Sequence, residues 1–168
     1  MLSSIFMIFC SLFTIGTCQT VNEWWRHTSV YQIYPRSFYD STADGVGDLN
    51  GITFKLDHLV DIGIEAFWVS PIYESPMADY GYDISNFTSI DSLFGTLQDF
   101  KILVYAAHEK GLKVVMDFIP NHSSDQHDWF KRSEDREDPY TDYYVWQDAK
   151  GFDENGMPIV PNNWVCKN

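Results

Sequence analysis

The run Ala66-Phe67-Trp68-Val69 decides the fold class, because it is a short unbroken apolar stretch that ends before Ser70-Pro71. Such a run is typical of a strand that is buried on both faces, as in a parallel sheet. A second run, Lys113-Val114-Val115-Met116-Asp117-Phe118, has the same character. Upstream, Val30-Tyr31-Gln32-Ile33-Tyr34-Pro35 is β-branched and aromatic and ends at a proline, as strands do. The three runs predict three strands.

Two helices are expected between these strands. Residues 52–62 carry apolar side chains at helical spacing, and Gly63 follows them as a stop signal. The second helix is expected to begin after Thr96, an N-cap residue with Asp99 three positions on, and to end before Gly111. We expect loops over residues 40–51 and 71–95. No clear period follows Pro120.

Strands that alternate with helices imply an α/β fold built from βαβ units with right-handed crossovers. A doubly wound sheet and a (β/α)8 TIM barrel both fit this order. A barrel needs ~250 residues, whereas the chain has 168. Three of eight strands are present, so in a barrel this chain would be a fragment.

The composition excludes some partners. Lys and Arg number 11 against 24 Asp and Glu, which gives a net charge of −13. A chain this acidic repels phosphate backbones, so we expect no nucleic acid and no basic membrane-surface role. Aromatic residues make up 17% of the chain, and their rings are good platforms for flat ligands.

The first residues predict a targeting segment. Residues 1–20 contain no Asp, Glu, Lys or Arg, and the apolar run 5–15 is too short to span a bilayer, which needs ~20 residues. Gly16-Thr17-Cys18 places small residues before a cleavage point at Gln19. We therefore expect a signal peptide over residues 1–18 and a secreted chain. The alternative is a short uncleaved anchor, and a C-terminal anchor in a longer form stays open.

Cysteine usage and two sequons agree with the secretory route. Cleavage would leave Cys166 as the single cysteine, so no internal disulfide is expected. Asn86-Phe87-Thr88 and Asn121-His122-Ser123 are acceptor patterns for N-linked glycans, so Asn86 and Asn121 are predicted glycosylation sites.

The stretch 40–48 has the donors of a cation loop. Asp40, Asp44 and Asp48 recur at four-residue spacing among glycines, and Val46 could add a carbonyl oxygen. Calcium binds such oxygen donors, with about 6–8 of them around the ion. An EF-hand is excluded, since its twelfth position is Gly51 instead of Glu. The alternative is an acidic, solvated loop.

Two further motifs have the residue types of a carbohydrate site. Residues 78–84, after the second strand, set aromatic rings beside carboxylates, so that a ring can cover the C–H face of a sugar while a carboxylate accepts from its hydroxyls. At the tip of the third strand, Asp117 is costly to bury unless it is paired or functional, and His122 follows it. The alternatives are a packed aromatic loop and a structural histidine.

Together these motifs resemble the α-amylase superfamily of glycoside hydrolases (family 13), and within it the secreted insect maltases, or α-glucosidases. The resemblance rests on residues 30–38, 45–49, 79–83 and 117–122 in that order, and it covers roughly Trp24 to Trp164. It implies a (β/α)8 barrel whose strands 1–3 lie within residues 19–120. Residues 121–168 would then start the B domain that this family inserts after strand three.

The resemblance also implies an activity and a site. Members cleave α-glucosidic bonds with retention and release terminal α-1,4-linked glucose from oligosaccharides, so α-glucosides such as maltose or sucrose are the expected partners. By position, Asp79, Tyr82 and His122 match residues that hold the non-reducing glucose, and Asp117 matches an Asp that supports the site. A structural Ca²⁺ is implied at Asp40, Thr42, Asp44, Val46 and Asp48. Thr42 departs from the usual Asp or Asn.

No catalytic residue is expected in the chain itself. Retaining glycosidases use a nucleophile and a general acid/base ~5–5.5 Å apart. In this family the two carboxylates follow strands four and five, beyond residue 168. Residues 165–168 also do not continue the family's sequence well, which indicates a premature end. We therefore expect the chain alone to be inactive.

Two non-catalytic readings stay open. Amino-acid-transporter heavy chains share the fold and act as partner subunits, but they begin with a cytosolic tail and a full membrane span. A sugar-binding protein would bind maltose without turnover. Oligo-1,6-glucosidases, sucrose hydrolases and isomerases on this scaffold cannot be separated from the sequence, because linkage preference is set around the missing nucleophile.

Overall fold

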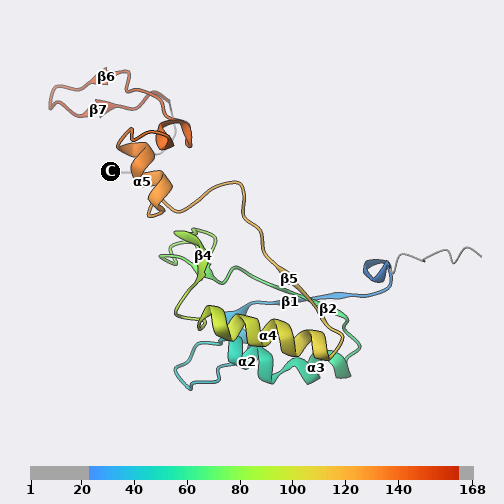
Figure 1. The fold of residues 1–168 in the computed structure, drawn as a ribbon. Coiled ribbons are helices and arrows are strands. Elements are labelled where there is room, and N and C mark those ends of the chain that lie inside the picture. The colour runs from blue at the N-terminus through green and yellow to red at the C-terminus, as the bar shows by residue number, and fades with distance from the viewer. Residues whose placement is uncertain (1–22, 163–168) are drawn as a thin grey trace, which may run out of the picture.

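The computed structural model describes residues 23–162. The predicted signal peptide, Cys166 and the predicted premature end lie outside these residues. Strands β1 (Val30–Ile33), β2 (Ala66–Val69) and β5 (Lys113–Met116) form a parallel sheet in the order β1-β2-β5 (Figure 1). In the register, Ile33 pairs with Val69 and Val69 with Met116. The three predicted strands and their parallel arrangement are confirmed.

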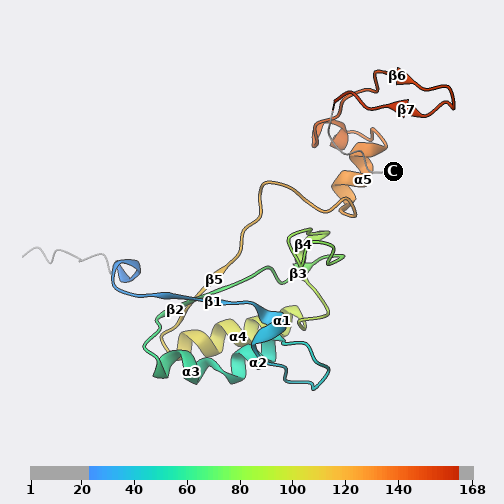
Figure 2. The same ribbon diagram turned by 180° about the vertical axis from the view of Figure 1, so that it is seen from behind.

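Helices α2 (Leu49–Phe54), α3 (Leu56–Asp61) and α4 (Leu97–Glu109) all lie on one side of this sheet (Figures 1 and 2). A doubly wound sheet has helices on both faces, whereas the wall of a barrel has them on its outer face alone. The arrangement therefore agrees with the first units of a (β/α)8 barrel.

Capping explains where the helices begin. Thr96 accepts a hydrogen bond from the backbone N of Asp99 (3.2 Å), and the Asp99 carboxylate accepts from the backbone N of Thr96 (2.8 Å), so the predicted cap is confirmed. The helix expected over 52–62 instead starts at Leu49 and is interrupted at Lys55. Its earlier start follows from Asp48, whose carboxylate accepts from the backbone N of Gly51 at 2.7 Å.

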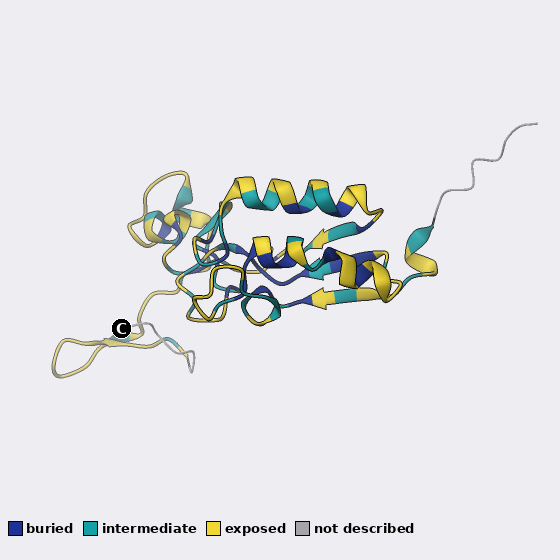
Figure 3. Ribbon diagram, turned by 90° about the horizontal axis from the view of Figure 1, so that it is seen from below, coloured by how far each residue is buried: buried dark blue, intermediate teal, exposed yellow. Residues whose placement is uncertain are grey.

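The core lies between the sheet and these helices, where the buried residues of Figure 3 gather. Fully buried side chains come from both the strands and the helices: Ile33, Phe67 and Val69 from strands, and Leu49, Ile52, Leu56, Leu59, Leu103 and Ala107 from helices. The opposite face of the sheet is open in part, since Val115 is 40% exposed. Strand β2, which lies between β1 and β5, is the most buried of the three, with Ala66, Phe67 and Val69 all buried.

The expected loop 71–95 was wrong in part, because it contains the antiparallel pair β3 (Tyr73–Glu74) and β4 (Asn86–Ile90). These strands are short and lack an apolar alternation, so the sequence pattern does not reveal them. Other short elements were also missed: η1 (Trp24–Arg26), α1 (Pro35–Phe38), α5 (Asp128–Glu134), η2 (Tyr140–Asp142), β6 (Gly151–Phe152) and β7 (Pro158–Ile159). None of the helices within residues 23–162 is long and apolar enough to cross a membrane.

Candidate sugar-binding site

The candidate site lies where β2 and β5 end. Asp117 follows the last residue of β5, and the segment after β2 leads into the β3–β4 hairpin. The carboxyl ends of parallel strands meet at one edge of a sheet, which is the edge that carries the active sites of barrel enzymes. The two motifs that the sequence singled out, 78–84 and 117–122, are therefore brought to the same place.

Tyr82 and Asp117 are joined directly. The Tyr82 hydroxyl donates to Oδ2 of Asp117 at 3.0 Å, across 35 residues of sequence. Burial, followed by the hydrogen bond and the charge of Asp117, raises the pKa of the Tyr82 phenol. Tyr82 therefore stays a neutral hydroxyl donor at neutral pH. The bond fixes the position of the Tyr82 hydroxyl relative to the tip of β5.

His122 is tied to the same loop. Its Nε2 lies 2.9 Å from the Tyr82 carbonyl oxygen, and its Nδ1 lies 3.1 Å from Nδ2 of Asn121. A carbonyl oxygen can only accept, so Nε2 carries the proton, and Nδ1 accepts from the Asn121 amide. This tautomer holds the imidazole against Tyr82. His122, Tyr82 and Asp117 thus form one connected group.

Asp79 lies in the loop beside this group. Its backbone carbonyl accepts from the backbone N of Tyr82 at 3.0 Å, and the residue as a whole is exposed. The charge of its carboxylate adds a minor contribution to the raised pKa of Tyr82. An exposed carboxylate next to a tyrosine is well placed to accept hydrogen bonds from a ligand.

The sequence did not single out Tyr73, which is part of the same arrangement. Its hydroxyl donates to the backbone carbonyl of Asp117 at 3.0 Å, and burial, then the Asp117 charge, raises the pKa of this phenol. The bond spans 44 residues. Nothing in the local sequence signals it, because Tyr73 stands in a segment without periodicity.

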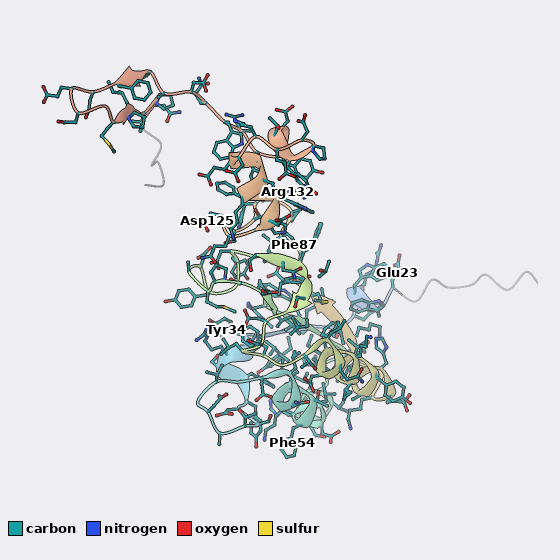
Figure 4. All side chains as sticks on the ribbon, turned by 60° about the vertical axis from the view of Figure 1, so that its left-hand side comes forward. Glu23, Tyr34, Phe54, Phe87, Asp125 and Arg132 are labelled. Atoms are coloured by element: carbon teal, nitrogen blue, oxygen red, sulfur yellow. The ribbon has the colours of Figure 1, made fainter. Side chains whose placement is uncertain are left out.

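An aromatic cavity of about 690 Å³ adjoins His122. It is bounded by residues 118–123 on one side and by α5 and the segment after η2 on the other, with Phe87 of β4 between them. Figure 4 shows Phe87 at this junction, where its ring stacks on Trp129 with centroids 6.3 Å apart. The lining residues are Phe87, Phe118, Ile119, Pro120, Asn121, His122, Ser123, Trp129, Phe130, Tyr143 and Tyr144. The sequence signals for this cavity were the motif 117–122, which forms one side of it, and the aromatic content of the chain.

The acidic loop 40–48 is closed by its own hydrogen bonds. The Asp40 carboxylate accepts from the backbone N of Ala43 (2.7 Å) and of Gly45 (2.7 Å), and these bonds, that of Gly45 foremost, hold its pKa below the usual value against a smaller opposing effect of desolvation. Oδ2 of Asp48 accepts from the backbone N of Ser41 at 2.8 Å. Within residues 23–162, no group of three or more His, Cys, Asp or Glu side chains is arranged to hold a metal ion.

The two sequons have different surroundings. Asn86 lies on β4, where its amide donates to Glu74 at 3.2 Å and its Oδ1 accepts from the Thr88 hydroxyl at 2.8 Å. Asn121 is exposed, and its amide is bonded to His122 in the candidate site. A glycan on Asn121 would therefore stand at the cavity, and one on Asn86 would stand on the hairpin.

Comparisons with known proteins place the chain among glycoside hydrolases. The family described as "Alpha amylase, catalytic domain" matches residues 32–167. Maltase A2 of Drosophila melanogaster is 57% identical over 143 residues, which are 85% of this chain and 25% of that protein. The human amino acid transporter heavy chain SLC3A1 is 45% identical over 163 residues, 97% of this chain and 24% of that one.

A solved structure agrees. The α-glucosyl transfer enzyme XgtA is 52% identical, with a TM-score of 0.75 over 84% of this chain and 26% of that one. The chain thus spans about a quarter of the length of the relatives that it matches.

Proposed function

The chain belongs to the α-amylase family of glycoside hydrolases, and from this premise we propose that the protein is an α-glucosidase of the maltase type. The proposed reaction is retaining hydrolysis of terminal α-1,4-linked glucose from oligosaccharides such as maltose. The observation that carries it is the connected group of Tyr82, Asp117 and His122 beside Asp79, at the edge of the sheet where barrel enzymes bind substrate.

Each residue has a proposed role in holding the terminal glucose. The exposed Asp79 carboxylate accepts from sugar hydroxyls, and the Tyr82 ring covers an apolar face of the sugar. His122 is fixed by its bond to the Tyr82 carbonyl, and its Nδ1 accepts from a further sugar hydroxyl in place of the Asn121 amide. Asp117 supports Tyr82 and performs no chemistry. The nucleophile and the general acid/base belong to later barrel strands, in line with the resemblance.

The test is an Asp79→Ala variant of the full-length protein. Removing a charged acceptor costs roughly 1.5–3 kcal/mol of binding. If these contacts strengthen in the transition state, kcat/KM on maltose should fall further than ground-state affinity. Asp61→Ala, an exposed carboxylate at the end of α3, is the matched control. Unchanged kcat/KM in both Asp79→Ala and His122→Ala would remove these residues from the site.

A transporter heavy chain is the second candidate, because the match to the human heavy chain extends over 97% of this chain. The two candidates differ in turnover. A full-length protein that hydrolyses p-nitrophenyl α-glucoside is an enzyme. A protein without turnover that co-purifies with a multi-span amino acid transporter is a heavy chain, and measurable maltose affinity without turnover or such a partner indicates a sugar-binding protein.

Secretion and glycosylation are also proposed. The support for secretion is the uncharged apolar run 5–15 with small residues before Gln19. N-terminal sequencing of secreted material should begin near Gln19, and intact Met1 in a membrane fraction would contradict cleavage. Asn86 and Asn121 are the proposed acceptors. Enzymatic removal of N-linked glycans should increase the electrophoretic mobility of the protein in one step for each glycan. Asn86→Gln and Asn121→Gln should each remove one of these steps, which assigns each glycan to its asparagine.

A calcium ion is the proposed occupant of the loop with Asp40, Thr42, Asp44, Val46 and Asp48. The support is the oxygen-only donor set, which suits a hard cation. Many of these oxygens accept backbone N–H groups in the structure, so binding would have to share or replace those bonds. Calorimetric titration should show binding that Asp44→Ala abolishes and Thr42→Asp tightens. Binding that Asp44→Ala leaves intact would place the ion elsewhere.

A further inference from the structure

The loop between β3 and β4 contains backbone conformations that are unfavourable for most residues. Met77 (φ 60°) and Tyr80 (φ 51°) both lie in the left-handed region, and Gly81 (φ 99°) follows them. Left-handed conformations are uncommon in residues other than glycine and persist where the surroundings hold them. The loop that carries Asp79 and Tyr82 therefore needs interactions that fix its shape.

One carboxylate supplies these interactions. Asp83 accepts from the Ser75 hydroxyl (2.8 Å), from the backbone N of Ala78 (2.9 Å) and from the backbone N of Asp79 (3.0 Å). The Ser75 hydroxyl oxygen accepts in turn from the backbone N of Met77 at 3.0 Å. The backbone N–H groups of residues 78 and 79 thus donate to Asp83 directly, and that of residue 77 is linked to Asp83 through the Ser75 hydroxyl.

The protonation state of Asp83 fits this role. Burial acts to raise the pKa of its carboxyl, but the hydrogen bonds from Ser75 and from the backbone of Asp79 and Ala78 outweigh it, and the net pKa is lowered. The group is therefore an ionised acceptor at neutral pH. An Asn in its place would keep one acceptor oxygen and turn an N–H donor toward another donor.

The loop shape determines where the proposed sugar-binding groups stand. Asp83 binds the backbone N of Asp79 directly, Tyr82 precedes Asp83 in the chain, and the backbone N of Tyr82 donates to the Asp79 carbonyl. Tyr82 is then joined to Asp117 through its hydroxyl and to His122 through its carbonyl. A change in the loop is thereby transmitted to all of these groups.

We propose that Asp83 is a positioning residue, whose carboxylate folds residues 75–83 so that Asp79 and Tyr82 are presented to the terminal sugar. It acts through these two residues and does not itself touch the sugar. The proposal rests on the proposed α-glucosidase function for its kinetic consequences, while the loop geometry stands apart from it.

The experiment compares Asp83→Asn with Asp99→Asn in the full-length protein. Asp99 is a matched control because it is also a carboxylate with a lowered pKa that accepts a backbone N–H, at the start of α4. Misplacing a binding group by about 1 Å can cost up to roughly a hundredfold in rate. We expect kcat/KM on maltose to fall at least about tenfold in Asp83→Asn, while Asp99→Asn stays within about threefold of wild type.

A double-mutant comparison separates positioning from general destabilisation. In an Asp79→Ala, Tyr82→Ala background, which removes both positioned groups, Asp83→Asn should add less than about twofold, because residues that act as a unit are not additive. A full effect in that background, or an unchanged kcat/KM in the single variant, overturns the proposal. Ser75→Ala removes one branch of the network and provides a milder variant should Asp83→Asn fail to fold.

Amide hydrogen exchange gives a readout without activity. The N–H groups of Ala78 and Asp79 should exchange at least about tenfold faster in Asp83→Asn, with the α4 amides unchanged. If the wild type hydrolyses no α-glucoside, the proposed function fails, and the exchange of these two amides alone decides the positioning role. Unchanged exchange at both overturns it.

Discussion

Residues 30–119 and residues 123–162 are held together by different forces. The first region has a core of aliphatic and aromatic side chains between a parallel sheet and three helices, beside the buried polar residues Asp48, Ser70 and Asp91. In the second region, the buried residues among those described are Ser124, His127 and Ser133, all polar. The Ser133 hydroxyl accepts from Nε1 of Trp146 at 2.8 Å and donates to the Thr141 carbonyl at 3.2 Å.

The second region is held together mainly by contacts between partly exposed aromatic rings. Phe130 contacts both Tyr144 and Trp146, and the Arg132 guanidinium lies 3.9 Å from the centre of the Tyr140 ring. Contacts of this kind contribute less than full burial of a large apolar side chain. The first region should therefore unfold as one cooperative unit, while the second should open locally.

The largest expected effect is in the core. Phe67→Ala removes a fully buried ring from β2 and should lower the free energy of unfolding by about 3–5 kcal/mol. Phe152→Ala, in β6 and 71% exposed, is the matched control and should change it by less than about 0.5 kcal/mol. Urea denaturation of both variants measures the difference. Equal destabilisation would show that the two regions share one core.

A smaller effect is expected from the cap of α4. Thr96→Ala removes the hydroxyl that accepts from the backbone N of Asp99 and should cost about 1 kcal/mol. Thr96→Ser keeps the oxygen and serves as the control. Since α4 packs on the sheet, we expect the loss to appear in global unfolding measured by urea. A loss confined to exchange of the first-turn amides would weaken the view that this region is one unit.

The counterpart in the second region is Trp146→Phe. This change keeps an aromatic ring against Phe130 but removes the N–H that donates to the Ser133 hydroxyl. The loss of that hydrogen bond should lower the free energy of local unfolding by roughly 0.5–1.5 kcal/mol. The cost should appear as faster proteolysis between α5 and Trp146, with the urea midpoint of the first region unchanged. A shift of that midpoint would contradict the division into two regions.

The smallest effect is a pH dependence at His127. Its Nδ1 accepts from the backbone N of Trp129 and caps α5. Burial lowers the pKa of His127, and the nearby Asp128 carboxylate only partly offsets this. The stabilisation is therefore complete above the unfolded pKa of about 6.5 and is lost as pH falls through the lower folded pKa.

Hydrogen exchange of the α5 amides at pH values from 7.5 down to 5, corrected for intrinsic rates, should show opening that increases a few-fold on acidification. His127→Asn keeps a capping acceptor that does not titrate in this range. It should flatten the dependence. An equal dependence in His127→Asn would assign the effect to other groups.

The local features of the first region could be predicted from the sequence. The apolar run 66–69 and the run 113–116 became strands, and the Thr96–Asp99 cap formed as expected. These features depend on side chains within a few positions of one another. The start of α2 at Leu49 was missed because Asp48 was assigned to a cation loop, although its carboxylate also caps the helix.

Residue type and order were enough to predict which side chains belong to a sugar site, but only the folded chain shows how these side chains are joined. Asp79, Tyr82, Asp117 and His122 stood out by type and order. The bond from Tyr82 to Asp117 spans 35 residues and that from His122 to the Tyr82 carbonyl spans 40. Such pairs meet only because β2 and β5 are parallel neighbours that end at one edge of the sheet.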